Sequence, residues 1–121
     1  MARVLVIDDS PVVRKIAQRV LEGMGLRSLE APGGREALAA CSISMPDAIL
    51  VDASMPAPDG YEFLSRLRQM PRGDRPKVVF CVSENDVAKI ARAMHAGADD
   101  FVMKPFEGDH LRSKFAFLTA H

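Results

Sequence analysis

The sequence predicts a doubly wound α/β fold, in which helices cover both faces of one parallel sheet. Short apolar runs with many β-branched residues alternate with longer segments whose apolar residues recur every three or four positions, and this happens five times. The apolar runs are nearly continuous, which is typical of strands covered on both faces. Such repeated units are joined by right-handed crossovers. The length of 121 residues suits one domain over residues 1–121.

The five predicted strands span residues 4–7, 29–31, 48–51, 78–82 and 101–103. In doubly wound sheets, ligands bind outside the carboxyl ends of the strands, where the strand order reverses. We therefore expect the functional residues at the points where these runs end.

The first predicted helix has a clear beginning and end. Ser10 can cap it, and Pro11 fits its first turn. Gly23 and Gly25 provide the stop. Its apolar stripe, which is expected to face the sheet, consists of Val13, Ile16, Ala17, Val20 and Met24.

Four further helices are expected between and after the remaining strands. The second and third span 34–41 and 61–69, and Pro71 with the turn at 73–74 ends the third. The fourth runs from about residue 84 to residue 95, and Gly97 closes it. The residues of the fourth helix that are expected to face inward are Val87, Ile90, Ala91 and Met94. The last helix is marked by Leu111, Phe115 and Leu118.

The composition is that of an ordinary globular domain, with 48% apolar and 26% charged residues. The 16 basic residues balance the 16 acidic residues, so no net field attracts the chain to nucleic acid or to an anionic membrane. No apolar stretch approaches the ~20 residues that span a bilayer, and segment 1–7 is too short for a signal peptide. Cys41 and Cys81 lie in apolar segments, which favours buried thiols in a reducing compartment. We expect a cytoplasmic protein with no nucleic-acid or membrane partner.

Four charged residues stand at the ends of predicted strands. Asp8 and Asp9 follow the first strand, Asp52 the third, and Lys104 the fifth. If the three carboxylates share one pocket, two of them ~5 Å apart repel by roughly 3 kcal/mol at an effective dielectric constant of ~20. A divalent cation removes that repulsion, and Mg²⁺ prefers one or two carboxylates together with waters and a phosphoryl oxygen. The strand ends therefore predict a magnesium site.

The same residues are the parts that phosphoryl transfer requires, namely a carboxylate nucleophile, a metal ion and a further cation. Asp52 is the best candidate for the nucleophile by position. It ends a buried strand, and the turn-rich segment 54–60 that follows leaves its carboxylate open.

Three motifs make the chain resemble the receiver domains of two-component response regulators over essentially its whole length. They are Asp8-Asp9, Asp52-Ala53-Ser54-Met55-Pro56-Ala57-Pro58-Asp59-Gly60 and Lys104-Pro105-Phe106, in the order and spacing of that family. The resemblance implies a single-domain, chemotaxis-regulator-like protein. It also implies a flavodoxin-like fold, with five helices and a five-stranded parallel sheet of strand order 2-1-3-4-5.

The resemblance further implies the roles of the site residues. Asp52 would accept a phosphoryl group from a histidine kinase or a phosphotransfer protein. Asp9, Asp52 and the backbone carbonyl of Ser54 would ligate Mg²⁺, and Asp8 would assist through water. Lys104 would pair with the phosphoryl oxygens, and the Lys104-Pro105 peptide bond is expected to be cis.

The sequence departs from the family pattern at the end of the fourth strand. The family places Thr or Ser there, and its hydroxyl bonds the phosphoryl group, but counting back from Lys104 puts Val82 at this position and Ser83 one residue later. Either Ser83 replaces the hydroxyl or the contact is lost. Ser83 also suits a helix cap with Asp86. Phe101 falls where the family has an aromatic rotamer switch, and it equally suits the core.

The expected function is a signalling switch, a phosphoacceptor that promotes its own phosphorylation and dephosphorylation, and not an enzyme. Phosphorylation would change the face made by the fourth helix, fifth strand and fifth helix, and a downstream protein effector would read that face from a monomer or an activation-linked dimer. A chemotaxis-type regulator, a phosphorelay shuttle and a receiver cut from a longer regulator all fit. A metal-dependent phosphohydrolase would need a general acid where Ser54 stands, and a flavodoxin-like cofactor binder would need a glycine-rich loop after the first strand.

Overall fold

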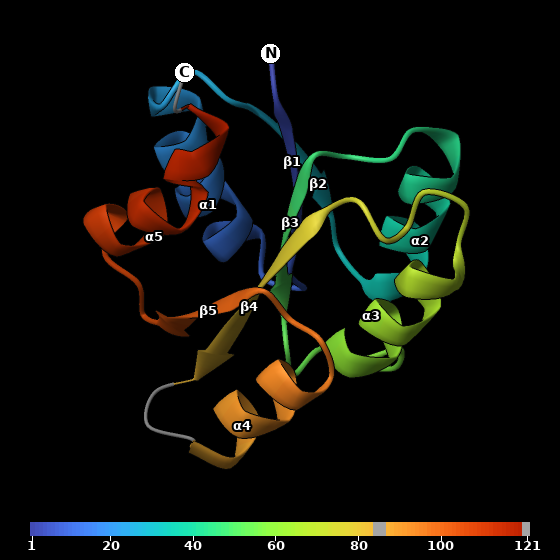
Figure 1. Cartoon of the computed structure of the whole chain (residues 1–121). Helices are drawn as coiled ribbons and strands as arrows, with labels where there is room; N and C mark the ends of the chain where they lie inside the picture. The colour runs from blue at the N-terminus through green and yellow to red at the C-terminus, as the bar shows by residue number, and fades with distance from the viewer. Residues whose placement is uncertain (84–86, 120–121) are drawn as a thin grey trace.

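Five strands form one parallel sheet in the computed structural model, which describes residues 1–83 and 87–119. The strands are β1 (Arg3–Ile7), β2 (Arg27–Ala31), β3 (Ala48–Asp52), β4 (Lys77–Ser83) and β5 (Asp100–Lys104). Their order across the sheet is β2-β1-β3-β4-β5, so β1 and β3 lie inside the sheet although they are not consecutive in the chain. This arrangement confirms the predicted doubly wound fold and its strand order (Figure 1).

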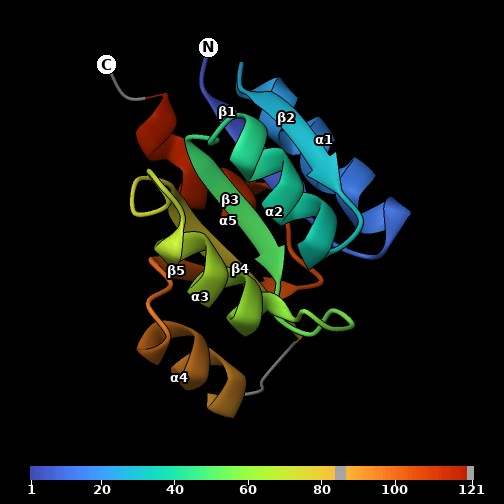
Figure 2. The same cartoon turned by 90° about the vertical axis from the view of Figure 1, so that its right-hand side faces the viewer.

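Helices cover both faces of the sheet. They are α1 (Pro11–Gly23), α2 (Gly34–Ile43), α3 (Gly60–Gln69), α4 (Val87–His95) and α5 (Gly108–Phe115), and a short 3-10 turn at Ala116–Leu118 follows α5. Figures 1 and 2 show α1 and α5 on one face and α2, α3 and α4 on the other. In the part of the chain that the structure describes, no helix combines the length and the apolar character needed to cross a bilayer.

Strand alternation separates the core into two clusters, one on each face of the sheet. The cluster beneath α1 and α5 contains Val4, Val6, Leu50, Val102 and Phe115, among others. The cluster beneath α2, α3 and α4 contains Ile7, Val51, Phe63, Phe80 and Val82, among others. Every residue of β3 is buried, as expected for a central strand covered on both faces.

The first helix begins as predicted, and its inward face matches the prediction except at Ile16. Ser10 Oγ accepts a hydrogen bond from the Val13 amide at 3.3 Å, and Pro11 occupies the first turn. The predicted inward position of Ile16 is wrong, because 48% of this residue is exposed. The inward position of Ala17 is confirmed, and Leu21, four residues later, is also fully buried. Val20 and Met24 pack against the same cluster, as predicted. Adjacent helix positions differ by about 100°, so Ile16 turns toward the edge of the contact.

The fourth helix differs from its predicted inward face at two positions. Ala91 and Met94 are exposed, and Ala93 is fully buried with Ile90 packed beside it. The inward position of Ile90 is thus confirmed, whereas those of Ala91 and Met94 are wrong, because the buried line runs through Ile90 and Ala93, three residues apart. The predicted start at residue 84, the pairing of Ser83 with Asp86 and the side chain of Val87 lie outside what the structure describes.

Both cysteines are buried free thiols, as predicted. Cys41 belongs to the cluster beneath α2, α3 and α4, and Cys81 belongs to the cluster beneath α1 and α5. Burial raises the pKa of the Cys41 thiol to about 11. Burial also raises the pKa of Cys81 to about 12, and the charges of Asp52 and Asp8 add to this rise against the opposing effect of Lys104. Cys81 is the partner of Asp52 in the register of β3 and β4.

Candidate functional site

The strand ends bring the predicted charged residues to one edge and one face of the sheet. Asp8 follows β1, Asp52 ends β3, and Lys104 ends β5. Each stands two positions after a residue of the cluster beneath α1 and α5: Val6, Leu50 and Val102 respectively. Alternation along a strand gives residues two apart the same face. The parallel strands thus carry these three side chains to the same place.

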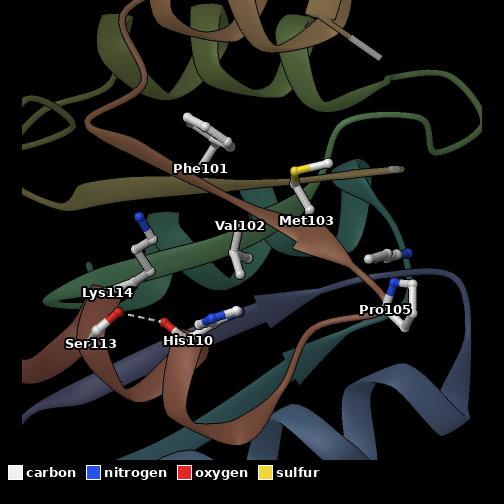
Figure 3. Close-up of a pocket in the computed structure, with 8 residues that line it drawn as sticks. Phe101, Val102, Met103, Pro105, His110, Ser113 and Lys114 are labelled. Carbon is white, nitrogen blue, oxygen red and sulfur yellow. Dashed lines mark hydrogen bonds between the residues drawn. The ribbon is translucent and has the colours of Figure 1, made fainter. Parts of the chain in front are cut away.

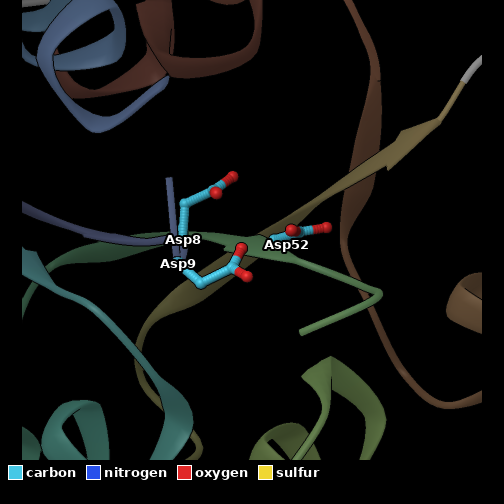
Figure 4. A group of neighbouring side chains, drawn as sticks. All are labelled: Asp8, Asp9 and Asp52. Carbon is cyan, nitrogen blue, oxygen red and sulfur yellow. The ribbon is translucent and has the colours of Figure 1, made fainter. Parts of the chain in front are cut away.

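Three carboxylates gather at this edge, as Figure 4 shows. One oxygen from each of Asp8, Asp9 and Asp52 lies within 4.8 Å of the others. Asp8 is 2% exposed and Asp52 is 9% exposed, whereas Asp9 is exposed. The cluster therefore extends from the interior to the surface.

Lys104 supplies a positive charge to two of these carboxylates. Its Nζ lies 2.7 Å from Asp8 Oδ2 and 3.2 Å from Asp52 Oδ2. Burial lowers the pKa of Lys104, but the hydrogen bond with Asp8 and the charges of Asp52 and Asp8 outweigh this effect and hold the pKa above its ordinary value. The ammonium group is therefore protonated throughout the neutral range.

Backbone amides fix the orientation of the two buried carboxylates. The Ser10 amide donates to Asp8 Oδ1 at 2.9 Å, and the Ser54 amide donates to Asp52 Oδ1 at 3.1 Å. Both donors lie two residues after their acceptors, so the loops turn back on the strand ends. Each carboxylate keeps its other oxygen, Oδ2, toward Lys104.

The loop after β3 is held against the end of its own strand. The Gly60 amide donates to the Ala53 carbonyl at 3.3 Å, and a Cβ on Gly60 would lie 2.8 Å from the Asp52 carbonyl oxygen. Asp59 caps α3 by accepting from the Glu62 amide at 2.9 Å. The Lys104-Pro105 peptide bond is cis, as predicted. These features define where Asp52 and Lys104 lie.

The donor set suits a hard divalent cation. Three carboxylates and one ammonium group leave a net charge of two minus when all are ionised, and all the negative ligands are oxygens. Mg²⁺ takes carboxylate, carbonyl and water oxygens. Asp8, Asp9 and Asp52 would hold such an ion, together with the carbonyl of the neighbouring Ser54. The chemistry that the ion supplies when bound is neutralisation of negative charge on a transferring phosphoryl group.

Val82 and Ser83, at the end of β4, face opposite sides of the sheet. Val82 is fully buried in the cluster beneath α2, α3 and α4. Ser83 is exposed, pairs with Lys104 in the strand register, and stands two positions after Cys81 on the face that carries Asp52. It also lines a cavity of about 360 Å³ together with Lys104, Pro105, Phe106, Val13 and Ile16. Ser83 is therefore the hydroxyl that the strand presents beside Lys104.

Phe101 lies on the other face of β5. Figure 3 shows Phe101 and Met103 on one side of the strand and Val102 on the opposite side. The Phe101 ring is half-buried against the cluster beneath α2, α3 and α4. Lys114 Nζ lies 5.6 Å from the centroid of this ring. The ring also lines a cavity of about 520 Å³ between β5 and α5.

Two side chains near the site were not found from the sequence. Arg14 donates to the Asp8 carbonyl at 2.6 Å and contacts Glu30 at 2.6 Å, so it joins the end of β1 to β2. Lys89 of α4 donates to Ser54 Oγ at 2.8 Å. Both partners are distant in the chain, and helical periodicity carries no signal for such contacts.

The fold and the site together define the class of this protein: a doubly wound α/β protein with an acid cluster and a lysine at the carboxyl edge of its sheet. The family model of the response regulator receiver domain matches residues 4–116. The chain belongs to this family. The predicted resemblance is thereby confirmed.

Individual relatives agree with this assignment. The chain is 35% identical over 114 residues to the KDP operon transcriptional regulatory protein KdpE of Escherichia coli (strain K12), covering 94% of this chain and 49% of that protein. The chemotaxis response regulator CheY4 of Vibrio cholerae is similar in structure, with a TM-score of 0.90, 29% identity and 98% of both chains covered. The Francisella response regulator 1452 receiver domain has a TM-score of 0.87 at 28% identity, covering 98% of this chain and 96% of that chain. The chain spans about half the length of the first curated relatives it matches.

Proposed function

We propose that this receiver domain is a phosphoacceptor switch of a two-component system in which Asp52 carries the phosphoryl group. The observation that supports this proposal most directly is the set of three carboxylates within 4.8 Å, two of which contact Lys104. A buried charge cluster of this kind is costly in an empty site, which favours a role in binding a cation and a phosphoryl group. The phosphodonor is a histidine kinase or a phosphotransfer protein.

In the proposed reaction, a carboxylate oxygen of Asp52 attacks the phosphorus atom of a phosphohistidine. The bond between phosphorus and the imidazole nitrogen breaks, and the imidazole leaves with its electron pair. Lys104 pairs with the phosphoryl oxygens. Asp9, Asp52 and the Ser54 carbonyl would hold the Mg²⁺, and Asp8 would assist through water. Hydrolysis of the acyl phosphate by water returns Asp52 to its carboxylate and releases inorganic phosphate. The protein thus promotes its own phosphorylation and dephosphorylation and is not a turnover enzyme.

Ser83 is proposed as the hydroxyl donor to the phosphoryl group, in place of Val82. Its exposure, its register with Lys104 and its place in the cavity beside Lys104 support this role. Val82 is fully buried against the opposite face. A hydrogen bond from Ser83 would draw the end of β4 toward the phosphoryl group and so stabilise one of two conformations of the domain.

The output surface is proposed to be the face made by α4, β5 and α5, with Phe101 as the switch residue. The Phe101 ring packs against the cluster beneath α2, α3 and α4 and also lines the cavity of about 520 Å³ between β5 and α5. The cavity gives the ring room for a second rotamer. A downstream protein effector would read this face in the cytoplasm, from a monomer or from a dimer formed on activation. With 16 basic and 16 acidic residues, the chain has no net charge to favour nucleic acid or an anionic membrane as the partner.

The experiment that tests this proposal is phosphorylation by acetyl phosphate or phosphoramidate with and without Mg²⁺. We expect one phosphoryl group per chain, and none without Mg²⁺ or in Asp52→Asn. The same variant should stabilise the metal-free protein by about 1 kcal/mol, because two repulsions are removed at the cost of one attraction to Lys104. Labelling that persists in Asp52→Asn would refute the assignment of the phosphoacceptor. Capture of proteins by the beryllofluoride-loaded chain, with Asp52→Asn as the control, then identifies the effector.

A further inference from the structure

A second ammonium group stands close to the proposed phosphoacceptor, on the helix that follows β4. Lys89 Nζ donates to Ser54 Oγ at 2.8 Å, and the Ser54 amide donates to Asp52 Oδ1 at 3.1 Å. Ser54 therefore joins the Lys89 ammonium to the Asp52 carboxylate through one residue. In sequence, Lys89 lies in α4, whereas Ser54 lies in the loop between β3 and α3.

The backbone of Lys89 is fixed independently of its side chain. The Tyr61 hydroxyl donates to the Lys89 carbonyl at 3.1 Å. The Tyr61 ring packs against Phe80 with centroids 5.3 Å apart, and the Arg92 guanidinium lies 3.9 Å from the Tyr61 centroid. This set of contacts anchors α4 to α3 and β4. The four-carbon side chain of Lys89 carries three donors and can reorient without moving the helix backbone.

Phosphorylation would place a charged acceptor beside the Lys89 ammonium group. In the metal-free protein its contact in the loop is a neutral hydroxyl. A phosphoryl group on Asp52 adds negative charge and three strong acceptor oxygens two residues before Ser54, and an anionic acceptor attracts an ammonium group more strongly than a neutral hydroxyl does. The single positive charge of Lys104 is already shared between Asp8 and Asp52. The added negative charge of a phosphoryl group could therefore attract a second ammonium group.

We infer that Lys89 is a second cation for the phosphoryl group, which exchanges its hydrogen bond with Ser54 Oγ for one with a phosphoryl oxygen. This inference rests on the proposed function of Asp52. The exchange ties α4 directly to the phosphorylated state. It gives this chain a second link between the site and the α4 surface, besides the proposed hydrogen bond from Ser83 at the end of β4.

Two variants separate this role from a purely structural tether. Beryllofluoride places three anionic acceptors where phosphoryl oxygens lie, and its affinity is measured in Mg²⁺ by fluorine NMR titration. We expect Lys89→Met to weaken binding about three- to tenfold and Lys89→Arg to retain most of it. Ser54→Ala should keep or raise the affinity, because it removes the competing acceptor. Lys77→Met, at the opposite end of β4, is the matched control and should match the wild type.

The outcomes are distinct. Unchanged affinity in Lys89→Met refutes the role of Lys89, and so does an equal loss in Ser54→Ala and Lys89→Met, which is the signature of a tether. The backbone amides of Ile90 and Ala93 provide a second readout: their chemical-shift change on beryllofluoride binding should shrink in Lys89→Met and persist in Lys77→Met. Failure of the wild type itself to bind would refute the proposed function as well, whereas wild-type binding that is lost in Asp52→Asn leaves only Lys89 in question.

Discussion

Lys104 donates to Asp8 across the edge of the sheet, with Nζ 2.7 Å from Oδ2. The two residues come from β5 and β1, which are separated in the sheet by β3 and β4. Only 3% of the Asp8 side chain is exposed, so the lysine is the cation that compensates a buried charge when no metal is bound. The lysine that would contact the phosphoryl group is therefore also a stabilising residue of the resting protein.

Replacing Lys104 with Met should lower the free energy of unfolding of the metal-free protein by about 2 kcal/mol, because a buried carboxylate loses its charged partner. Millimolar Mg²⁺ should recover much of that loss, since the ion supplies the missing positive charge. Urea unfolding with and without Mg²⁺ measures both values. Lys15→Met, an exposed position on α1, controls for removal of a lysine. An equal loss in both conditions would argue against a cation site at these carboxylates.

Ser83→Ala should weaken beryllofluoride binding about tenfold, because a hydrogen bond to a charged group is removed. It should change the free energy of unfolding by less than about 0.5 kcal/mol, because Ser83 is exposed. A loss of about 1 kcal/mol in stability with unchanged binding would instead identify Ser83 as a helix cap.

Val82→Thr tests the neighbouring position. This change buries a hydroxyl in the apolar cluster beneath α2, α3 and α4, so it should destabilise the protein by about 1–3 kcal/mol. It should not raise the beryllofluoride affinity of Ser83→Ala, because the side chain points away from Lys104. Recovery of binding in the double variant would show that the threonine side chain can reach the site, contrary to the orientation of β4.

Gly60→Ala should destabilise the protein by about 1–3 kcal/mol and reduce phosphorylation of Asp52. The added Cβ would lie 2.8 Å from the Asp52 carbonyl oxygen and 2.9 Å from Ala53 Cα, so the loop must move away from the strand end. Gly23→Ala is the control, because a Cβ there meets nothing within 4 Å. It should be neutral or stabilising by up to about 1 kcal/mol. Thermal unfolding and acetyl phosphate labelling of both variants check this prediction.

The buried thiol of Cys41 should make stability fall at alkaline pH. Its pKa is raised from 9.0 to about 11, so the unfolded chain releases this proton at a lower pH than the folded chain. The contribution is fully present below pH 9 and is lost as the pH rises toward 11, at about 1 kcal/mol between pH 9 and pH 10. Urea unfolding at these two pH values should show a smaller decrease for Cys41→Ala. Equal decreases would mean that the thiol is ionised in the folded protein.

Local patterns in the sequence determined the order of strands and helices and the edge at which the charged residues meet. Parallel strands align their carboxyl ends, so Asp8, Asp52 and Lys104 were predicted to converge from position alone. The motifs around these residues also identified the receiver family.

Tertiary structure alone decided which way individual side chains face. Ile16 and Met94 fit an apolar stripe by spacing, but the contact of their helices with the sheet leaves both side chains exposed. The choice between Val82 and Ser83 depends on strand register, because a shift of one residue reverses the face. The contacts of Arg14 and Lys89 join segments that no periodicity connects. The spacing of apolar residues predicts helices and strands because their periodicity extends over a few neighbouring residues. The direction in which a side chain faces, and the residues it contacts, depend on how the helices and strands pack together.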